Sequence, residues 1–124
     1  MADSIDLGSG GAPVDGYAAG VAALHDLVAE LPPRPPVTQG RMFNGDGLRV
    51  RGRMFAFIGR NGDLVVKLPE PRVRQLVDQN TGTAVVMGTR TMREWVRVSA
   101  DAGVGRWSEA LEEAHGFALT LTPS

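Results

Sequence analysis

Residues 47–68 constrain the fold more than any other part of this chain, because two turn signals divide them into three short apolar stretches. In the first stretch Leu48 and Val50 alternate with arginines, and such period-2 alternation is typical of a strand with one buried face. Arg51-Gly52 and Asn61-Gly62 supply the turns, since glycine adopts a positive φ without steric cost. We therefore expect a meander of three antiparallel strands.

The tetrapeptide Gly-Arg-Met-Phe occurs twice here, at residues 40–43 and again at residues 52–55. A solenoid needs roughly three or more units, so two copies do not make a repeat protein. The first copy also fails as a phosphate-binding loop, because neither a Lys-Ser/Thr pair nor a helix follows it. We interpret the copies as two strands of one sheet, with a turn at residues 44–47.

A first helix is predicted to begin at Asp15, which is suited to an N-cap. It ends before Pro32 and Pro33, since proline cannot donate to the helix ladder. The proline-rich run 32–36 is expected to form a stiff, extended connector to the sheet. Residues 1–14, rich in small and polar side chains, are expected to be a flexible N-terminal tail. The apolar positions at helical spacing are Tyr17, Val21, Leu24, Leu27, Val28 and Leu31.

Two more helices enclose a second strand pair. A short helix follows the Pro-Glu-Pro run at residues 69–71 and ends before Gly82. Residues 83–87 are rich in β-branched residues, and residues 92–98 alternate again, so both segments are expected to form strands around a turn at residues 88–91. A last helix ends at Gly116, and Phe117 and Leu119 then pack as an extended tail. Its inner stripe consists of Trp107, Leu111 and Ala114.

The resulting order, α-β-β-β-α-β-β-α, predicts an α+β fold with two layers: a five-stranded antiparallel sheet with helices packed on one face. A chain of 124 residues is one domain by size, which we place at residues 15–124. Its 43% hydrophobic and 22% charged residues are typical of a globular protein. No stretch approaches the roughly 20 apolar residues that span a bilayer, so no membrane contact is expected. Without cysteine or a secretory leader, a cytoplasmic protein is predicted.

No residues form a catalytic, cofactor-binding or metal-binding pattern. His25 and His115 have no metal-ligand spacing and are interpreted as surface or boundary residues, with His115 complementing a helix C-terminus. Glu112 and Glu113 adjoin on a helix and point in different directions, which does not suit an acid/base pair. No serine lies in a nucleophile elbow. We therefore expect a non-enzymatic protein without cofactors.

The charge distribution singles out a different set of residues. The net charge is −1, but residues 41–74 carry eight bases against three acids. On the last strand Trp95 lies between two arginines, an arrangement that can clamp a nucleic-acid base. The favoured interpretation is that Trp95 fills the core or a dimer interface while its neighbours reach for water. The candidate interaction residues are Arg49, Arg51, Arg53, Lys67, Arg93, Trp95 and Arg97.

Four motifs resemble the TfoX N-terminal domain family and the related MmcQ/YjbR-like proteins. They are Met42-Phe43-Asn44-Gly45-Asp46-Gly47-Leu48, Gly52-Arg53-Met54-Phe55-Ala56-Phe57-Ile58, Asp63-Leu64-Val65-Val66-Lys67-Leu68-Pro69 and Met92-Arg93-Glu94-Trp95-Val96-Arg97-Val98. The similarity covers roughly residues 17–117. It implies a secretion-chaperone-like or CyaY-like fold, frequent dimerisation and a link to competence regulation.

The expected function is a non-enzymatic protein-interaction or regulatory module, a homodimer that also binds an unknown protein partner. The alternative is a nucleic-acid-associated transcriptional or competence regulator that binds through an arginine-rich sheet face.

Overall fold

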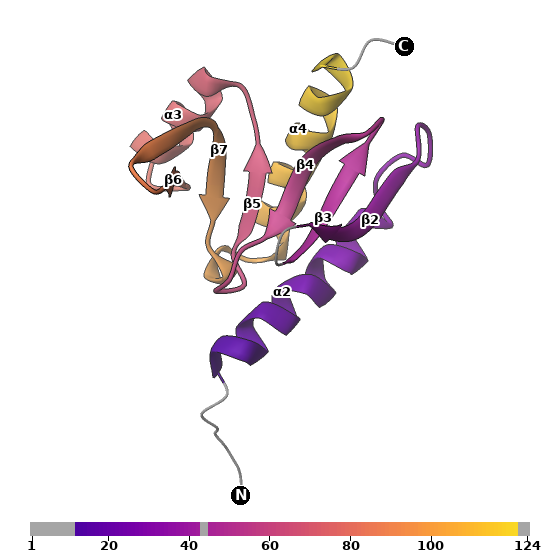
Figure 1. The fold of residues 1–124 in the computed structure, drawn as a ribbon, viewed down its shortest axis with the longest axis horizontal. Coiled ribbons are helices and arrows are strands. Elements are labelled where there is room, and N and C mark those ends of the chain that lie inside the picture. Colours follow the sequence, from indigo (N-terminus) through magenta and orange to yellow (C-terminus); the bar gives the residue numbers. More distant parts are fainter. Residues whose placement is uncertain (1–11, 43–44, 122–124) are drawn as a thin grey trace, which may run out of the picture.

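The computed structural model describes residues 12–42 and 45–121, which form three α-helices, six strands and a short 3-10 helix (Figure 1). In chain order the elements are α2 (Ala12–Val28), β2 (Val37–Met42), β3 (Gly45–Val50), β4 (Arg53–Ile58), β5 (Leu64–Lys67), α3 (Glu70–Asp78), β6 (Thr83–Met87), β7 (Arg90–Val98), η1 (Ala100–Ala102) and α4 (Val104–Leu121). The predicted α+β class is confirmed.

All the strands belong to one antiparallel sheet in the order β2-β3-β4-β5-β7-β6. The prediction of five strands is wrong, because that count does not include β2, although the first Gly-Arg-Met-Phe copy is interpreted as a strand. Its sequence Val-Thr-Gln-Gly-Arg-Met has no clear alternation, yet it pairs with β3 over its whole length, from Val37↔Val50 to Met42↔Gly45. The turn predicted at residues 44–47 is therefore wrong for residues 45–47, which belong to β3, while Asn44 lies outside the described residues.

The predicted meander is confirmed in β3, β4 and β5. Arg51 and Gly52 form the first turn with φ values of 53° and 81°. In the second turn the Gly62 N–H donates to the Gly59 carbonyl at 2.9 Å, and Gly62 has a φ of 88°. The first Gly-Arg-Met-Phe copy starts in β2. The second begins with Gly52 in the β3–β4 turn and continues into β4, so the two copies flank β3.

One face of the sheet carries the main core and all three helices. In the view of Figure 1, α4 passes behind β4 and β5. From the helices, Leu24, Leu76 and Leu111 belong to the same buried cluster, so each helix contributes to one core. The strand residues that point into it are Leu48, Val50, Ala56, Ile58, Leu64, Val66, Val96 and Val98. A bulge between Leu48 and Arg49 also brings Phe55 of β4 into the cluster.

Helix α2 begins at Ala12, three residues before the predicted N-cap Asp15, and a proline at its second position is compatible with a helix start. Residues 12–14 are therefore helical, and residues 1–11 of the predicted tail lie outside the described residues. The helix packs closely on the β4–β5 turn, where a Cβ on Gly20 would lie 2.7 Å from the Gly62 carbonyl oxygen. The connector at residues 32–36 bends rather than running straight.

Of the other two helices, α3 is predicted more accurately than α4. The short helix α3 is confirmed, with Val73 and Leu76 buried. The predicted end of the last helix at Gly116 is wrong, because α4 continues to Leu121 and includes the predicted tail. Glycine lowers helix propensity by roughly 1 kcal/mol, and burial of Ala118 in the next turn helps to offset that cost.

Candidate functional site

The sheet face opposite the helices is not covered by any helix of the described chain. We call it the open face. The strand register places its side chains in neighbouring rows, since Phe57 pairs with Val65, Val65 with Arg97, and Lys67 with Trp95. Arg49 and Met54 pair on the same face beyond the bulge. The open face thus includes Arg49, Met54, Phe57, Val65, Lys67, Trp95 and Arg97.

An aromatic pair lies at the centre of the open face. The ring centroids of Phe57 and Trp95 are 5.5 Å apart at an angle of 55°. The rings come from β4 and β7, so they meet over β5, the strand between them. Val65 on that strand is only 1% exposed although it lies outside the main core cluster, which fits a position beneath the two rings. Lys67 Nζ lies 5.7 Å from the Trp95 ring centroid, within reach of a cation–π interaction.

Positive side chains surround this pair, and two acids lie at the margin. Arg97 Nε is 3.9 Å from an Asp63 carboxylate oxygen, and Lys67 Nζ is 3.9 Å from a Glu94 carboxylate oxygen. The other Asp63 oxygen accepts from the Ala100 N–H at 3.0 Å, which orients the carboxylate. These ion pairs are partly exposed, so they position the cations rather than stabilise the fold strongly.

The structure brings together four of the seven candidate interaction residues, namely Arg49, Lys67, Trp95 and Arg97. Arg51 does not share the strand face of Arg49 as predicted, because it lies in the β3–β4 turn. Arg53 is exposed at the start of β4 and pairs with Val50, a residue of the helix-covered side. The favoured interpretation placed Trp95 in the core or a dimer interface. Its first half is wrong, since Trp95 is half-buried outside the core cluster, and its second half stays a prediction.

A hollow adjoins the open face at the β6–β7 hairpin. Its volume is about 620 Å³, and it is lined by Lys67 and residues 89–95. The register between β6 and β7 steps from Ala84↔Val96 to Val85↔Met92, so β7 bends where Arg93 and Trp95 project. Arg90 was missed as a site residue because the sequence placed it in a turn, whereas the turn is shorter and β7 already begins at Arg90.

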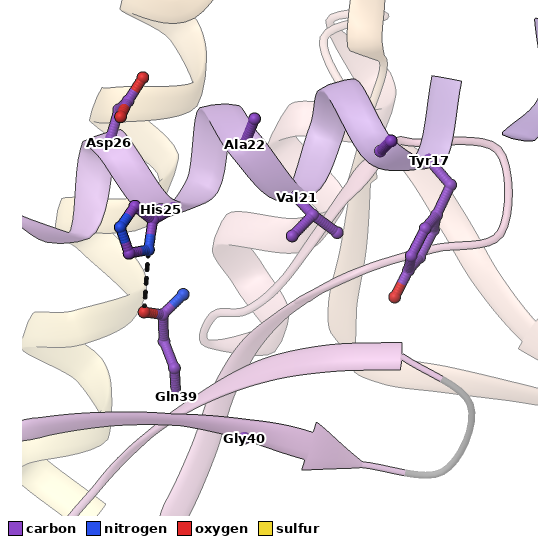
Figure 2. A pocket seen from close by; sticks show the side chains of 8 residues that line it. Tyr17, Val21, Ala22, His25, Asp26, Gln39 and Gly40 are labelled. Carbon is purple, nitrogen blue, oxygen red and sulfur yellow. Dashed lines mark hydrogen bonds between the residues drawn. The ribbon is translucent and has the colours of Figure 1, made fainter. Parts of the chain in front are cut away.

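The two histidines lie in different environments. His25 is exposed, as predicted, and its Nδ1 lies 3.2 Å from the Gln39 side-chain oxygen. Figure 2 shows these two residues facing each other across a groove between α2 and β2, with Val21 and Tyr17 also turned toward β2. Asp26 points away from β2 in the same view, so the groove does not gather acid and histidine ligands around one point.

The prediction that His115 is a surface or boundary residue at a helix end is wrong. It is 4% exposed, lies within α4, and contacts the Phe55 ring edge-on with centroids 5.6 Å apart. Its Nε2 has no hydrogen-bond partner among the described residues. Burial lowers the pKa of His115 below its usual value, so the ring is neutral at pH 7. We treat His115 as a core residue.

Glu113 has a structural role between two helices. Glu113 accepts two hydrogen bonds from the Arg72 guanidinium at 2.8 and 2.9 Å, joining α4 to α3. This bond, more than any other effect, raises the pKa of Arg72. Within residues 12–42 and 45–121, no cluster of three or more histidine, aspartate or glutamate side chains is arranged to hold a metal. None of the helices described is both long and apolar enough to cross a bilayer.

No family model, no curated protein and no solved structure matches this chain. The resemblance to the TfoX N-terminal domain family and the secretion-chaperone-like or CyaY-like fold name therefore stay predictions.

Proposed function

We propose that this chain is a non-enzymatic interaction module that binds a protein partner through the open face. The observation that carries this proposal is the Phe57–Trp95 pair, whose ring centroids are 5.5 Å apart on a sheet surface that none of the described helices covers. Tryptophan, phenylalanine and arginine are enriched at the centres of protein interfaces. An antiparallel sheet with one face packed on helices leaves its second face for solvent or a partner.

The charge of the open face defines the partner further. Arg49, Lys67 and Arg97 flank the aromatic pair, while Asp63 and Glu94 lie at the margin beside two of these cations. An acidic protein segment with an apolar residue complements such a surface. Two copies of the open face would bring like charges together, so this face does not suit self-association.

The second part of the proposal is a homodimer. The edge strand β6 suits a dimer interface better than the open face does. Val86 and Met87 on this strand are 56% and 55% exposed. The strand Thr-Ala-Val-Val-Met carries none of the charges, prolines or glycines that usually protect a sheet edge. Antiparallel pairing of β6 with the β6 of a second copy would satisfy its outward backbone groups without charge repulsion. Replacing Val86 by lysine should then convert the dimer into a monomer in light scattering; an unchanged mass, or a monomeric parent protein, contradicts this site.

The partner proposal is tested by affinity capture with matched charge reversals. Arg97→Glu reverses a charge on the open face, whereas Arg74→Glu reverses an exposed arginine on α3, on the opposite side of the sheet. We expect one identified protein with an acidic segment to be captured by the parent protein and by Arg74→Glu, and to be lost with Arg97→Glu. Equal capture by both variants would refute binding through the open face.

A second candidate function is binding of single-stranded nucleic acid by the same face. The specific observation in its favour is that an aromatic pair lies among cations, which is the arrangement that stacks bases and follows a phosphate backbone. Oligonucleotide binding should weaken steeply as salt is raised, because neutralised phosphates release counterions. If no oligonucleotide binds at low salt, this candidate is excluded. The regulatory role implied by the TfoX resemblance, and a cytoplasmic location suited to a chain without cysteine, are further parts of the proposal.

A further inference from the structure

Positive side chains outnumber acids in the hollow beside the open face. Lys67, Arg90 and Arg93 line it, and Glu94 is the one acid among the described residues of its lining. Glu94 lies 3.9 Å from Lys67, so that lysine is partly neutralised. Arg90 and Arg93 are both exposed, and they lie on β7 on the hairpin side of the register step. An anion in the hollow would therefore be attracted by a net positive charge.

The same hollow also contains a flat apolar surface. The Trp95 indole forms part of its wall beside Lys67. Phe57 contacts Trp95 from the centre of the sheet and limits the movement of the indole. Thr89 and Thr91 add hydroxyl groups at the hairpin end. The lining therefore combines guanidinium and hydroxyl donors with an aromatic ring.

We propose that this hollow binds a nucleotide, with the phosphate held by Arg90 and Arg93 and the base placed against the Trp95 ring. Guanidinium groups form charge-assisted, often bidentate hydrogen bonds with phosphate. Aromatic rings stack on bases of any sequence. The groove between α2 and β2 lacks this combination among the described residues of its lining, which include Asp26 and His25 but no lysine or arginine. A free nucleotide and one unit of a single strand present the same chemistry to the hollow.

This inference goes beyond the protein-binding role and adds Arg90, a residue outside the open face. It also names the position where a base would lie if a nucleic acid binds. The two proposals fail separately. Suppose that Arg90→Ala and Arg93→Ala leave oligonucleotide binding intact while Arg97→Glu abolishes it. Nucleotide binding in the hollow is then refuted, and nucleic-acid binding by the open face remains supported.

The experiment uses the full chain and the intrinsic fluorescence of Trp95. Trp107 is 4% exposed and donates its ring N–H to the Ser99 carbonyl at 2.9 Å, so it should be insensitive to ligands. The probes are adenosine monophosphate, inorganic phosphate and a short single-stranded oligonucleotide, titrated at low salt. We expect the nucleotide to change the fluorescence and to bind at least about tenfold more tightly than phosphate, because stacking adds to the charge contacts.

Matched variants assign the signal to the hollow. Arg90→Ala and Arg93→Ala should each weaken nucleotide binding by about tenfold, while Arg74→Ala should leave it unchanged. Trp95→Phe should remove the fluorescence change, and a thermal-shift assay then follows binding. If the affinity of the oligonucleotide, counted per nucleotide, exceeds that of adenosine monophosphate, the ligand is a single strand. If the two affinities are equal, the ligand is the free nucleotide. No response to any nucleotide at millimolar concentration, binding of phosphate as tight as that of the nucleotide, or an equal loss with Arg74→Ala overturns the inference.

Discussion

Replacing Trp107 by alanine should destabilise this protein far more than replacing Trp95. Trp107 lies in the core between α4 and the sheet, is 4% exposed, and donates a 2.9 Å hydrogen bond to the Ser99 carbonyl. Truncation of a buried tryptophan costs about 3–5 kcal/mol. A domain of this size has a free energy of unfolding of about 5–15 kcal/mol, so the loss is a large part of the total.

Trp95 loses much less on truncation because it is half-buried on the open face. Its contact with Phe57 contributes about 0.5–1.5 kcal/mol and the approach of Lys67 about 0.5–1 kcal/mol. We therefore expect Trp95→Ala to cost about 1–2.5 kcal/mol. The same substitution should abolish partner or nucleotide binding, whereas Trp107→Ala in the folded state should not.

Urea denaturation followed by far-ultraviolet circular dichroism measures both costs without depending on tryptophan fluorescence. With a slope of about 2 kcal/mol per molar urea, Trp107→Ala should lower the midpoint by about 2 M and Trp95→Ala by about 1 M or less. If Trp95→Ala lowers the midpoint as much as Trp107→Ala, Trp95 belongs to the core and the open face does not exist as described.

Three further predictions concern positions away from the open face. Gly116→Ala should stabilise the protein by about 0.5–1 kcal/mol, since an added Cβ meets open space inside α4. Gly20→Ala should destabilise it, because the Cβ would lie 2.7 Å from a backbone oxygen. Melting temperatures of the two variants equal to that of the parent protein would contradict both expectations. Stability should fall as pH drops below about 6.5, by up to about 1.4 kcal/mol per pH unit until the folded ring also protonates, because the unfolded chain takes up a proton that buried His115 resists. His115→Phe should flatten this slope between pH 7.5 and 5.5, and an unchanged slope would exclude His115 as its origin. Removing the charge of Glu113 with Glu113→Gln should cost less than about 1 kcal/mol and lose its effect at high salt, since the bond to Arg72 is partly exposed; a salt-independent cost would argue against an ion pair.

The central strands could be predicted from the sequence because local signals and burial agree there. Leu48 and Val50 alternate with arginines, and the glycines at 52 and 62 adopt the positive φ that their turns require. Strand β2 could not be predicted in the same way. Its residues are mostly polar and glycine-containing, and they adopt a strand because β3 supplies hydrogen-bond partners over the full length. The pairing is long-range, and no local pattern records it.

The last helix shows a related limit. The glycine at position 116 predicts a helix end, but packing of His115 and Ala118 against the core continues the helix beyond it. Tertiary burial here outweighs the unfavourable propensity of one glycine. The same burial explains why His115 is a core residue although histidine is a polar residue type.

The candidate site was predictable only in part. The period of two placed Trp95 and Arg97 on one strand face, but strand order was needed to bring Arg49 and Lys67 beside them. The hollow depends on the bend in β7, which places Arg90 and Trp95 around one space. A register step of this kind leaves no signal in composition or periodicity.

The central claim of this account is that neighbouring residues of a strand lie on opposite faces of the sheet, one open and one covered by helices. Thiol labelling tests this claim directly. The chain has no cysteine, so single-cysteine variants report one position each. Arg97→Cys and Arg49→Cys place the thiol on the open face, while Val96→Cys and Leu48→Cys place it one residue away on the helix-covered face. We predict that the first pair reacts at least about a hundredfold faster than the second, because buried thiols react only after local or global opening. Equal labelling rates at positions 96 and 97, and at positions 48 and 49, would contradict the account.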